Sequence, residues 1–153
     1  MTTAMPHPGR RLRDAWERGT VMVPGAFNAL VARAAAQAGF EACYISGGAT
    51  ANVAGYPDIG LITMTEMCRT IREIADASKL PVIADADTGY GEVECCIRTV
   101  VEYERAGAAA LGGLLGAASV LPSSGRLRVA LAGVAIAGVS FLPYFVIPDL
   151  QPL

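Results

Sequence analysis

The sequence predicts an α/β protein whose strands lie parallel in one sheet. Up to about residue 111, short apolar segments alternate with longer segments that have the periodicity of amphipathic helices. An order of strand, helix, strand, helix is typical of parallel strands joined by right-handed crossovers. Polar residues and glycines follow two of the expected strands, at the edge of a parallel sheet where ligands bind.

Four segments are expected to be strands. Each is a short run of apolar residues, and the first ends at Pro24 and Gly25. The expected strands are 20–25, 41–46, 81–85 and 108–111. With the intervening helices they build either a doubly wound sheet or a (β/α)8 barrel. No G-x-G-x-x-G motif follows a strand, which counts against a dinucleotide-binding fold.

Two helices have clear start signals. One begins after Asn28, an N-cap residue, and ends near Gly39. The other begins at Thr63, whose spacing to Glu66 is that of a capping box, and continues to Ala77. Its apolar positions lie on one helical face and are Met67, Ile71, Ile74 and Ala75.

A third helix is expected before Gly107. Its expected apolar face consists of Val93, Ile97, Val100 and Val101, and its charged residues lie on the opposite face. Residues 47–60, between the second expected strand and Thr63, read as a long loop.

Composition excludes several classes of protein. The 153 residues are 53% hydrophobic and have a mean hydropathy of +0.42, which suits one folded domain. A net charge of -2 offers no basic face for nucleic acid. The four cysteines form no metal-binding motif with the only histidine, His7, which we expect in a mobile end. Reduced, mostly buried thiols indicate a cytoplasmic protein, with a mitochondrial or membrane-associated location as the open alternative.

Residues 112–153 differ in character from the rest of the chain. Their only charged residues are Arg126, Arg128 and Asp149, and the stretch 129–147 has none. That stretch is close to the roughly 20 residues that span a bilayer, but Pro143 and many small residues favour a divergent tail. We therefore expect an α/β unit at 1–111 and an apolar tail at 112–153. Membrane association of 129–147 is the less favoured alternative.

Asp85 and Asp87 are the first candidate site residues. They stand one residue apart where an apolar strand runs into the stretch "TGYG". In an extended chain such residues point to the same side, about 7 Å apart, where two carboxylates repel unless a cation or proton lies between them. Mg²⁺ takes oxygen ligands and often uses one or two carboxylates with several waters. The alternative is that one aspartate caps the next helix or shapes a turn.

A second candidate lies directly after the strand 41–46. Ser46, Gly47 and Gly48 offer consecutive amides and a hydroxyl that suit a carboxylate or phosphate, although a flexible turn explains the same residues. Tyr44 would face either the core or the site.

The remaining polar motifs are weaker. Asp58 in "GYPDIGL" reads by itself as a turn residue. No serine or cysteine is paired with the histidine as a nucleophile. Cys95 and Cys96 are interpreted as packing residues of the third expected helix.

Taken in order, these motifs resemble one family. The segments are "VPGAFNALVARAAAQAGFEACYISGGATANVAGYPDIGLITMTEM", "LPVIADADTGYGE" and "VVEYERAGAAAL". They are similar to the isocitrate lyase/phosphoenolpyruvate mutase superfamily, and most of all to its short members of the 2-methylisocitrate lyase type. The resemblance covers about residues 10–111.

The resemblance implies the N-terminal half of a (β/α)8 barrel of the phosphoenolpyruvate/pyruvate type, in a family that usually forms homotetramers. It implies a Mg²⁺-dependent reaction on a small di- or tricarboxylate. The residues that would bind substrate are Tyr44, Ser46, Gly47, Gly48 and Asp85. Asp85 and Asp87 would hold the metal ion, and Asp58 would complete the polar surroundings of that ion.

The chain departs from the family pattern after Leu111. The family places there an acidic pair and a lysine-rich loop with "KKCGH", whose cysteine is the catalytic acid in lyases. Here "GGLLGAASV" has no acid, lysine, cysteine or histidine, so no catalytic residue is identified. A complete barrel typically needs about 250 residues.

The family implies a carbon–carbon lyase that cleaves a 2-methylisocitrate-like substrate to pyruvate and succinate. We expect this chain to be truncated and impaired or inactive. One alternative is a non-catalytic isoform that binds Mg²⁺ and carboxylate weakly, or that associates with full-length subunits. Another is a phosphoenolpyruvate mutase or an oxaloacetate-cleaving member of the same family.

Overall fold

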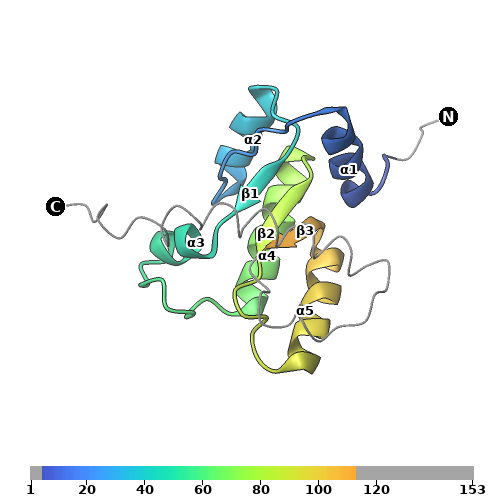
Figure 1. Ribbon diagram of the computed structural model, residues 1–153. Helices are drawn as coiled ribbons and strands as arrows, with labels where there is room; N and C mark the ends of the chain where they lie inside the picture. Colours follow the sequence, from blue (N-terminus) through green and yellow to red (C-terminus); the bar gives the residue numbers. More distant parts are fainter. Residues whose placement is uncertain (1–4, 113–153) are drawn as a thin grey trace, which may run out of the picture.

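The computed structural model describes residues 5–112, which contain five helices and three strands (Figure 1). In chain order they are α1 (Pro8–Arg18), α2 (Ala29–Gln37), β1 (Cys43–Ile45), α3 (Gly47–Val53), α4 (Met64–Ser78), β2 (Val82–Asp85), α5 (Val93–Ala106) and β3 (Ala108–Gly112). Within this part of the chain, no helix is both long and apolar enough to cross a membrane. The expectations for residues 113–153, including the stretch 129–147, lie outside the described residues.

The three strands form one parallel sheet in the order β1-β2-β3. Tyr44 pairs with Ile83, and Asp85 pairs with Gly112, with an irregularity between Val82 and Ile83. Helices α4 and α5 lie in the connections that lead into β2 and β3. The prediction of a parallel α/β fold is therefore confirmed for this part of the chain.

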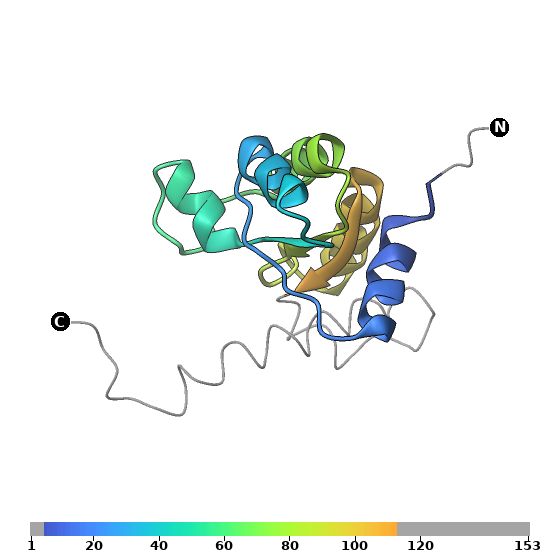
Figure 2. The ribbon, with the colours of Figure 1, turned by 90° about the horizontal axis from the view of Figure 1, so that it is seen from above.

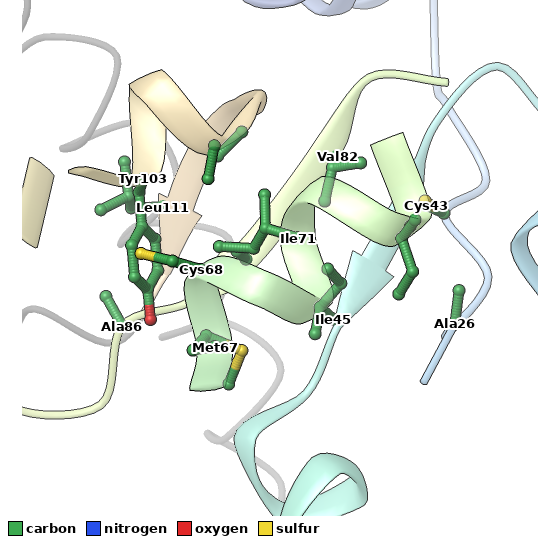
Figure 3. Close-up of a cluster of buried hydrophobic side chains, with 14 of the residues drawn as sticks. Ala26, Cys43, Ile45, Met67, Cys68, Ile71, Val82, Ala86, Tyr103 and Leu111 are labelled. Carbon is green, nitrogen blue, oxygen red and sulfur yellow. The ribbon is translucent and has the colours of Figure 1, made fainter. Parts of the chain in front are cut away.

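Apolar residues cover both faces of the sheet. Because alternate strand residues point to opposite faces, Cys43, Ile45 and Val82 pack in one cluster with the helices α2, α4 and α5. Figure 3 shows Met67 and Ile71 of α4 on the side of Ile45 and Val82, and Cys68 beside Tyr103 and Leu111. The buried face of α4 consists of Met67, Cys68, Ile71 and Ile74, which confirms three of the four positions predicted for it; Ala75 is half-buried.

The opposite face of the sheet is covered by α1. Leu12 is 1% exposed and packs with Ala42, Ile83, Ala109 and Ala110. In Figure 2, α1 lies on the other side of β3 from α2 and α4. The start of α1 corrects the expectation for His7, because its Nδ1 accepts a hydrogen bond from the Gly9 amide and caps the helix.

The prediction of a strand at 20–25 is wrong in extent. Only Gly25 forms a β-bridge, a parallel one with Tyr44. The Tyr44 amide donates to the Pro24 carbonyl at 2.9 Å, and the Ala26 amide donates to the Tyr44 carbonyl at 2.7 Å. Pro24 has no amide hydrogen to extend the ladder, so the segment lies along β1 without becoming a regular strand.

The prediction of a loop throughout 47–60 is also wrong, because residues Gly47–Val53 form α3. Ser46 is the N-cap of this helix, and its Oγ accepts a hydrogen bond from the Ala49 amide at 3.3 Å. Serine after a strand favours a helix start at this position. The glycines that suggested a flexible loop are the first two helical residues.

The buried face of α5 differs from the predicted one. It consists of Cys96, Thr99, Tyr103 and Ala106, whereas Ile97 is 48% exposed. The α5 face that packs on the sheet therefore includes polar side chains. Their hydrogen bonds to the preceding loop make that burial favourable, because a buried polar group that has a partner avoids the desolvation cost.

Candidate functional site

Two side chains of the predicted site lie on neighbouring strands and on one face of the sheet. Tyr44 of β1 packs with Ile83 on the face of the sheet that α1 covers. Asp85 follows Ile83 by two residues on β2, so its side chain points to the same face. Asp85 Oδ2 accepts a hydrogen bond from the Gly47 amide at 3.1 Å and a longer one from the Tyr44 hydroxyl at 3.4 Å. The ends of β1 and β2 are thereby joined through one carboxylate.

Asp87 does not continue the strand. β2 ends at Asp85, and Asp87 has a φ of 49°, in the left-handed region. Its amide donates to Asp85 Oδ1 at 3.0 Å. The expectation that both side chains alternate along one extended chain is therefore wrong. The alternative, in which an aspartate shapes a turn, is confirmed for Asp85.

Two glycine contacts bring Asp58 and Asp87 to the same region. A Cβ on Gly48 would lie 2.6 Å from Asp58 Oδ2, and a Cβ on Gly60 would lie 3.3 Å from Asp87 Oδ2. A Cβ on Gly47 would lie 3.1 Å from Asp85 Oδ2. Carboxylates thus occupy the space beside glycines of α3 and of the loop that follows it.

The donor atoms gathered here are carboxylate oxygens, and such oxygens suit a hard divalent cation. Among the described residues, no three His, Cys, Asp or Glu side chains form a group close enough to hold a metal ion by themselves. Mg²⁺ commonly keeps several waters and uses one or two carboxylates. The residues present therefore fit a hydrated Mg²⁺ ion, with Asp85 half-buried and Asp58 and Asp87 exposed.

The Tyr44 hydroxyl is a neutral donor over a wide pH range. Burial, and next the nearby negative charge of Asp85, raise the pKa of Tyr44 to about 12. Tyr44 therefore stays protonated at neutral pH, and its hydroxyl donates a hydrogen bond to the Asp85 carboxylate. This arrangement orients the carboxylate without adding a second negative charge.

The glycine-containing loop after β2 is fixed by α5, which the sequence reading missed. The Tyr103 hydroxyl donates to the Asp85 carbonyl at 3.0 Å, and Thr99 Oγ1 lies 2.9 Å from the Gly89 carbonyl. The Cys96 thiol lies 3.5 Å from the Thr88 carbonyl. Residues at 96, 99 and 103 share one helical face, and this spacing was the signal that could have found them.

A separate hollow of about 390 Å³ lies at the other end of the sheet, beside Leu80 and Gly107. Its lining includes four basic residues, but Arg11 Nη1 already donates to the Lys79 carbonyl at 2.6 Å. Lys79 in turn pairs with Asp76 at 3.5 Å. Arg11 satisfies a carbonyl at the carboxyl end of α4, where a cation is favourable. The hollow shares no residue with the candidate site.

The arrangement defines a class of protein, a barrel-type α/β protein with acidic residues at the carboxyl ends of its strands. A sequence profile described as phosphoenolpyruvate phosphomutase matches residues 12–112. The chain belongs to this family, the phosphoenolpyruvate mutase/isocitrate lyase family, as its motifs indicated. The matched residues contain every residue of the candidate site.

Known proteins match over the same part of the chain. 2-Methylisocitrate lyase of Aeropyrum pernix is 48% identical over 105 residues, which are 68% of this chain and 34% of that protein. The crystal structure of phosphoenolpyruvate phosphomutase from Streptomyces platensis subsp. rosaceus is similar with a TM-score of 0.67 and 40% identity, over 70% of this chain and 38% of that chain.

A second similar structure holds ligands. It is a phosphonopyruvate hydrolase complex with oxalate and Mg²⁺, with a TM-score of 0.66 and 29% identity, covering 86% of this chain and 48% of that chain. The present chain spans about a third of the length of the curated relatives it matches.

Proposed function

We propose that this chain binds Mg²⁺ and a small carboxylate at the carboxyl ends of β1 and β2. The observation that carries the proposal is the Asp85 carboxylate, which is held by the amides of Gly47 and Asp87. The Asp58 side chain lies beside Gly48, the residue after Gly47. The similar phosphonopyruvate hydrolase, crystallised with oxalate and Mg²⁺, supports it. Further support comes from the all-oxygen donor set.

Each residue has a distinct role in this proposal. Asp85 and Asp87 hold the ion, and Asp58 completes its polar surroundings through water. When bound, the ion supplies Lewis-acid stabilisation of an enolate. The glycines allow the carboxylates to approach the backbone closely, since a Cβ on Gly48 would stand 2.6 Å from Asp58 Oδ2 and one on Gly47 would stand 3.1 Å from Asp85 Oδ2.

The substrate carboxylate is bound by the start of α3 in this proposal. The Gly47 amide already donates to Asp85, so the remaining donors are the Gly48 amide and the Ser46 hydroxyl. The first amides of a helix have no intrahelical acceptor. Ser46 Oγ accepts from the Ala49 amide and keeps its own hydrogen for a ligand. Tyr44 lines the same pocket beside Asp85.

The reaction we propose is that of a carbon–carbon lyase that cleaves a 2-methylisocitrate-like substrate to pyruvate and succinate. The name of the Aeropyrum pernix relative supports this choice. A phosphoenolpyruvate mutase or an oxaloacetate-cleaving reaction is the alternative within the family, because a phosphoenolpyruvate phosphomutase matches in structure as well. The shared chemistry is an enolate stabilised beside a carboxylate.

The chain is proposed to have weak or no turnover by itself. Among the described residues, no cysteine or histidine is placed at the site to serve as a catalytic acid. Cys96 is buried against the loop carbonyls, and His7 lies at the start of α1. The sequence directly after Leu111 lacks acid, lysine, cysteine and histidine.

A second candidate is a non-catalytic chain that binds Mg²⁺ and carboxylate weakly or associates with full-length subunits. The stretch "GGLLGAASV" after Leu111, which holds no acid, lysine, cysteine or histidine, favours it. It fits a division into a barrel-type unit at 1–111 and an apolar region at 112–153, which is likewise a proposal. A homo-oligomer of the chain belongs to the same candidate.

The test combines binding and turnover on the purified chain. Calorimetry with MgCl2, with and without oxalate, measures ion binding, and pyruvate release from 2-methylisocitrate measures lyase activity. We expect Mg²⁺ binding in the wild type, at least tenfold weaker binding in Asp85→Asn, and little pyruvate. Asp76→Asn, an exposed change on α4, is the matched control. Absence of Mg²⁺ binding in the wild type would overturn the proposal, and turnover like that of full-length relatives would overturn the second candidate.

A further inference from the structure

The buried face of α5 holds the loop 85–91 at successive carbonyl groups. Three side chains from this face contact the carbonyls of Thr88, Gly89 and Asp85, and they are Cys96, Thr99 and Tyr103. Of these bonds, the one from Tyr103 is directed at a residue of the candidate site itself. The other two contact the loop beyond it, and Thr99 Oγ1 also lies 2.9 Å from the Cys95 carbonyl of α5 itself.

Tyr103 is fully buried, with 0% of its surface exposed. Its ring extends from α5 toward the chain at Ala86, directly after Asp85 (Figure 3). The hydroxyl donates to the Asp85 carbonyl at 3.0 Å and lies 2.8 Å from the Tyr90 hydroxyl. A hydroxyl has one hydrogen to donate. Tyr90 is therefore the donor to Tyr103, and Tyr103 is the donor to Asp85.

The Asp85 carbonyl needs this donor because the neighbouring strand has ended. β1 pairs with β2 only as far as Ile45 and Ala84. The next amide in line, that of Gly47, donates to the Asp85 carboxylate. On the other side, the Ala86 amide donates to the Gly112 carbonyl at 2.8 Å. The Tyr103 hydroxyl thus replaces a missing strand partner.

We propose that Tyr103 is a positioning residue for Asp85, acting from behind the strand through the backbone carbonyl. It fixes the peptide after Asp85, and this peptide leads to the Asp87 amide that holds Oδ1. The orientation of the carboxylate then depends on a hydroxyl that does not touch the ion or the substrate. The proposal rests on the Mg²⁺ site described under Proposed function.

Tyr103→Phe tests the proposal because it removes one oxygen and keeps the ring. Calorimetry with MgCl2 measures ion affinity, and amide hydrogen exchange measures the protection of the Gly47 and Asp87 amides that hold Asp85. We expect about tenfold weaker Mg²⁺ binding and faster exchange of these two amides than of the α4 amides. Should Tyr103→Phe not fold, Tyr103→Met fills the same space.

Two controls separate positioning from a general loss of stability. Ile74→Val changes a buried residue of α4, far from the loop in sequence, and is expected to leave both readouts unchanged. Tyr90→Phe keeps the bond from Tyr103 to Asp85 and is expected to leave the Gly47 and Asp87 amides protected. If Tyr103→Phe lowers only the melting temperature, as Ile74→Val does, the positioning proposal is wrong.

The two proposals fail in different ways. Wild-type chain without measurable Mg²⁺ binding overturns the metal site, and hydrogen exchange then decides by itself whether Tyr103 orders Asp85. If the wild-type chain binds Mg²⁺ and Tyr103→Phe changes neither the Mg²⁺ affinity nor the amide hydrogen exchange, the positioning role is overturned. The metal site then stays in place.

Discussion

Gly48 lies so close to Asp58 that a Cβ at that position would stand 2.6 Å from the Asp58 Oδ2. Gly48 belongs to the first turn of α3, whereas Asp58 lies in the exposed loop that follows this helix. The contact needs the absence of a side chain, not a glycine backbone conformation, because Gly48 is not among the glycines with positive φ. A substitution of Gly48 by alanine should therefore move the Asp58 carboxylate without straining the backbone of α3.

Gly48→Ala is predicted to weaken Mg²⁺ binding without loss of stability. The new methyl group displaces the Asp58 carboxylate, whereas alanine in a helix is more favourable than glycine by about 0.5–1 kcal/mol. Calorimetry should show a several-fold lower affinity, and thermal unfolding an equal or higher midpoint. Gly25→Ala, where no atom lies within 4 Å of the added Cβ, is the control and should bind as the wild type. Unchanged affinity in Gly48→Ala would remove Asp58 from the proposed site.

The cysteines are predicted to react in an order set by burial. All four thiols are free, and only Cys95 is exposed. Burial raises the pKa of the Cys43 thiol to about 11, and it also raises the pKa of Cys68. Because the thiolate is the reactive form, iodoacetamide at pH 8 should modify Cys95 first and Cys43 last. Mass spectrometry of timed samples measures the order, and Cys95→Ser should remove the fast phase. Early modification of Cys43 would contradict the packing of β1.

The prediction of the fold from the sequence succeeded where local signals decide structure. The capping box of Thr63 and Glu66 is present with both of its hydrogen bonds, and the Asn28 cap and the Gly107 stop are found at their predicted places. These signals act within a few residues and require no knowledge of tertiary contacts.

The prediction failed where distant partners decide structure. The Tyr103 hydroxyl is buried with the Asp85 carbonyl as acceptor, and Thr99 Oγ1 lies 2.9 Å from the carbonyls of both Gly89 and Cys95. A helical pattern of apolar residues cannot show such partners. The direction of Asp87 depends on a left-handed residue after the strand, which strand alternation does not describe. At the site, alternation was applied only to Asp85 and Asp87, and the sequence left open whether Tyr44 faces the core or the site. The contact of Asp58 with Gly48 has no local signal at all.

The capping box of α4 predicts a pH dependence of stability. Hydrogen bonds from the Thr63 hydroxyl and then from its amide lower the pKa of Glu66 from its ordinary value of 4.5. A carboxyl group with a lowered folded-state pKa stabilises the fold above its unfolded pKa, and this contribution is lost as pH falls through the folded pKa. Wild type should therefore lose stability relative to Thr63→Ala between neutral pH and pH below 4.5. Denaturant unfolding over this range measures the difference.

Glu66→Gln is the matched control for that measurement. Glutamine retains a hydrogen-bond acceptor for the capping box but does not titrate. The stability difference between Glu66→Gln and the double variant Thr63→Ala/Glu66→Gln should stay flat as the pH falls, because neither protein carries the titrating carboxyl group. A slope in this control equal to that of the wild type would assign the pH dependence to another carboxyl group.

Lys79→Gly is predicted to stabilise the chain. Lys79 ends α4 with a φ of 59°, a left-handed conformation that costs an L residue about 1 kcal/mol and costs glycine little. The lost ion pair with Asp76 is exposed on both sides and contributes little, and the Lys79 carbonyl that Arg11 binds remains. After the added entropy of glycine in the unfolded chain, we expect a net gain of about 0.5 kcal/mol in the free energy of unfolding. Lys79→Ala removes the same side chain and keeps the Cβ, so it should show no gain. Equal stability of the two variants would show that the left-handed residue carries no strain.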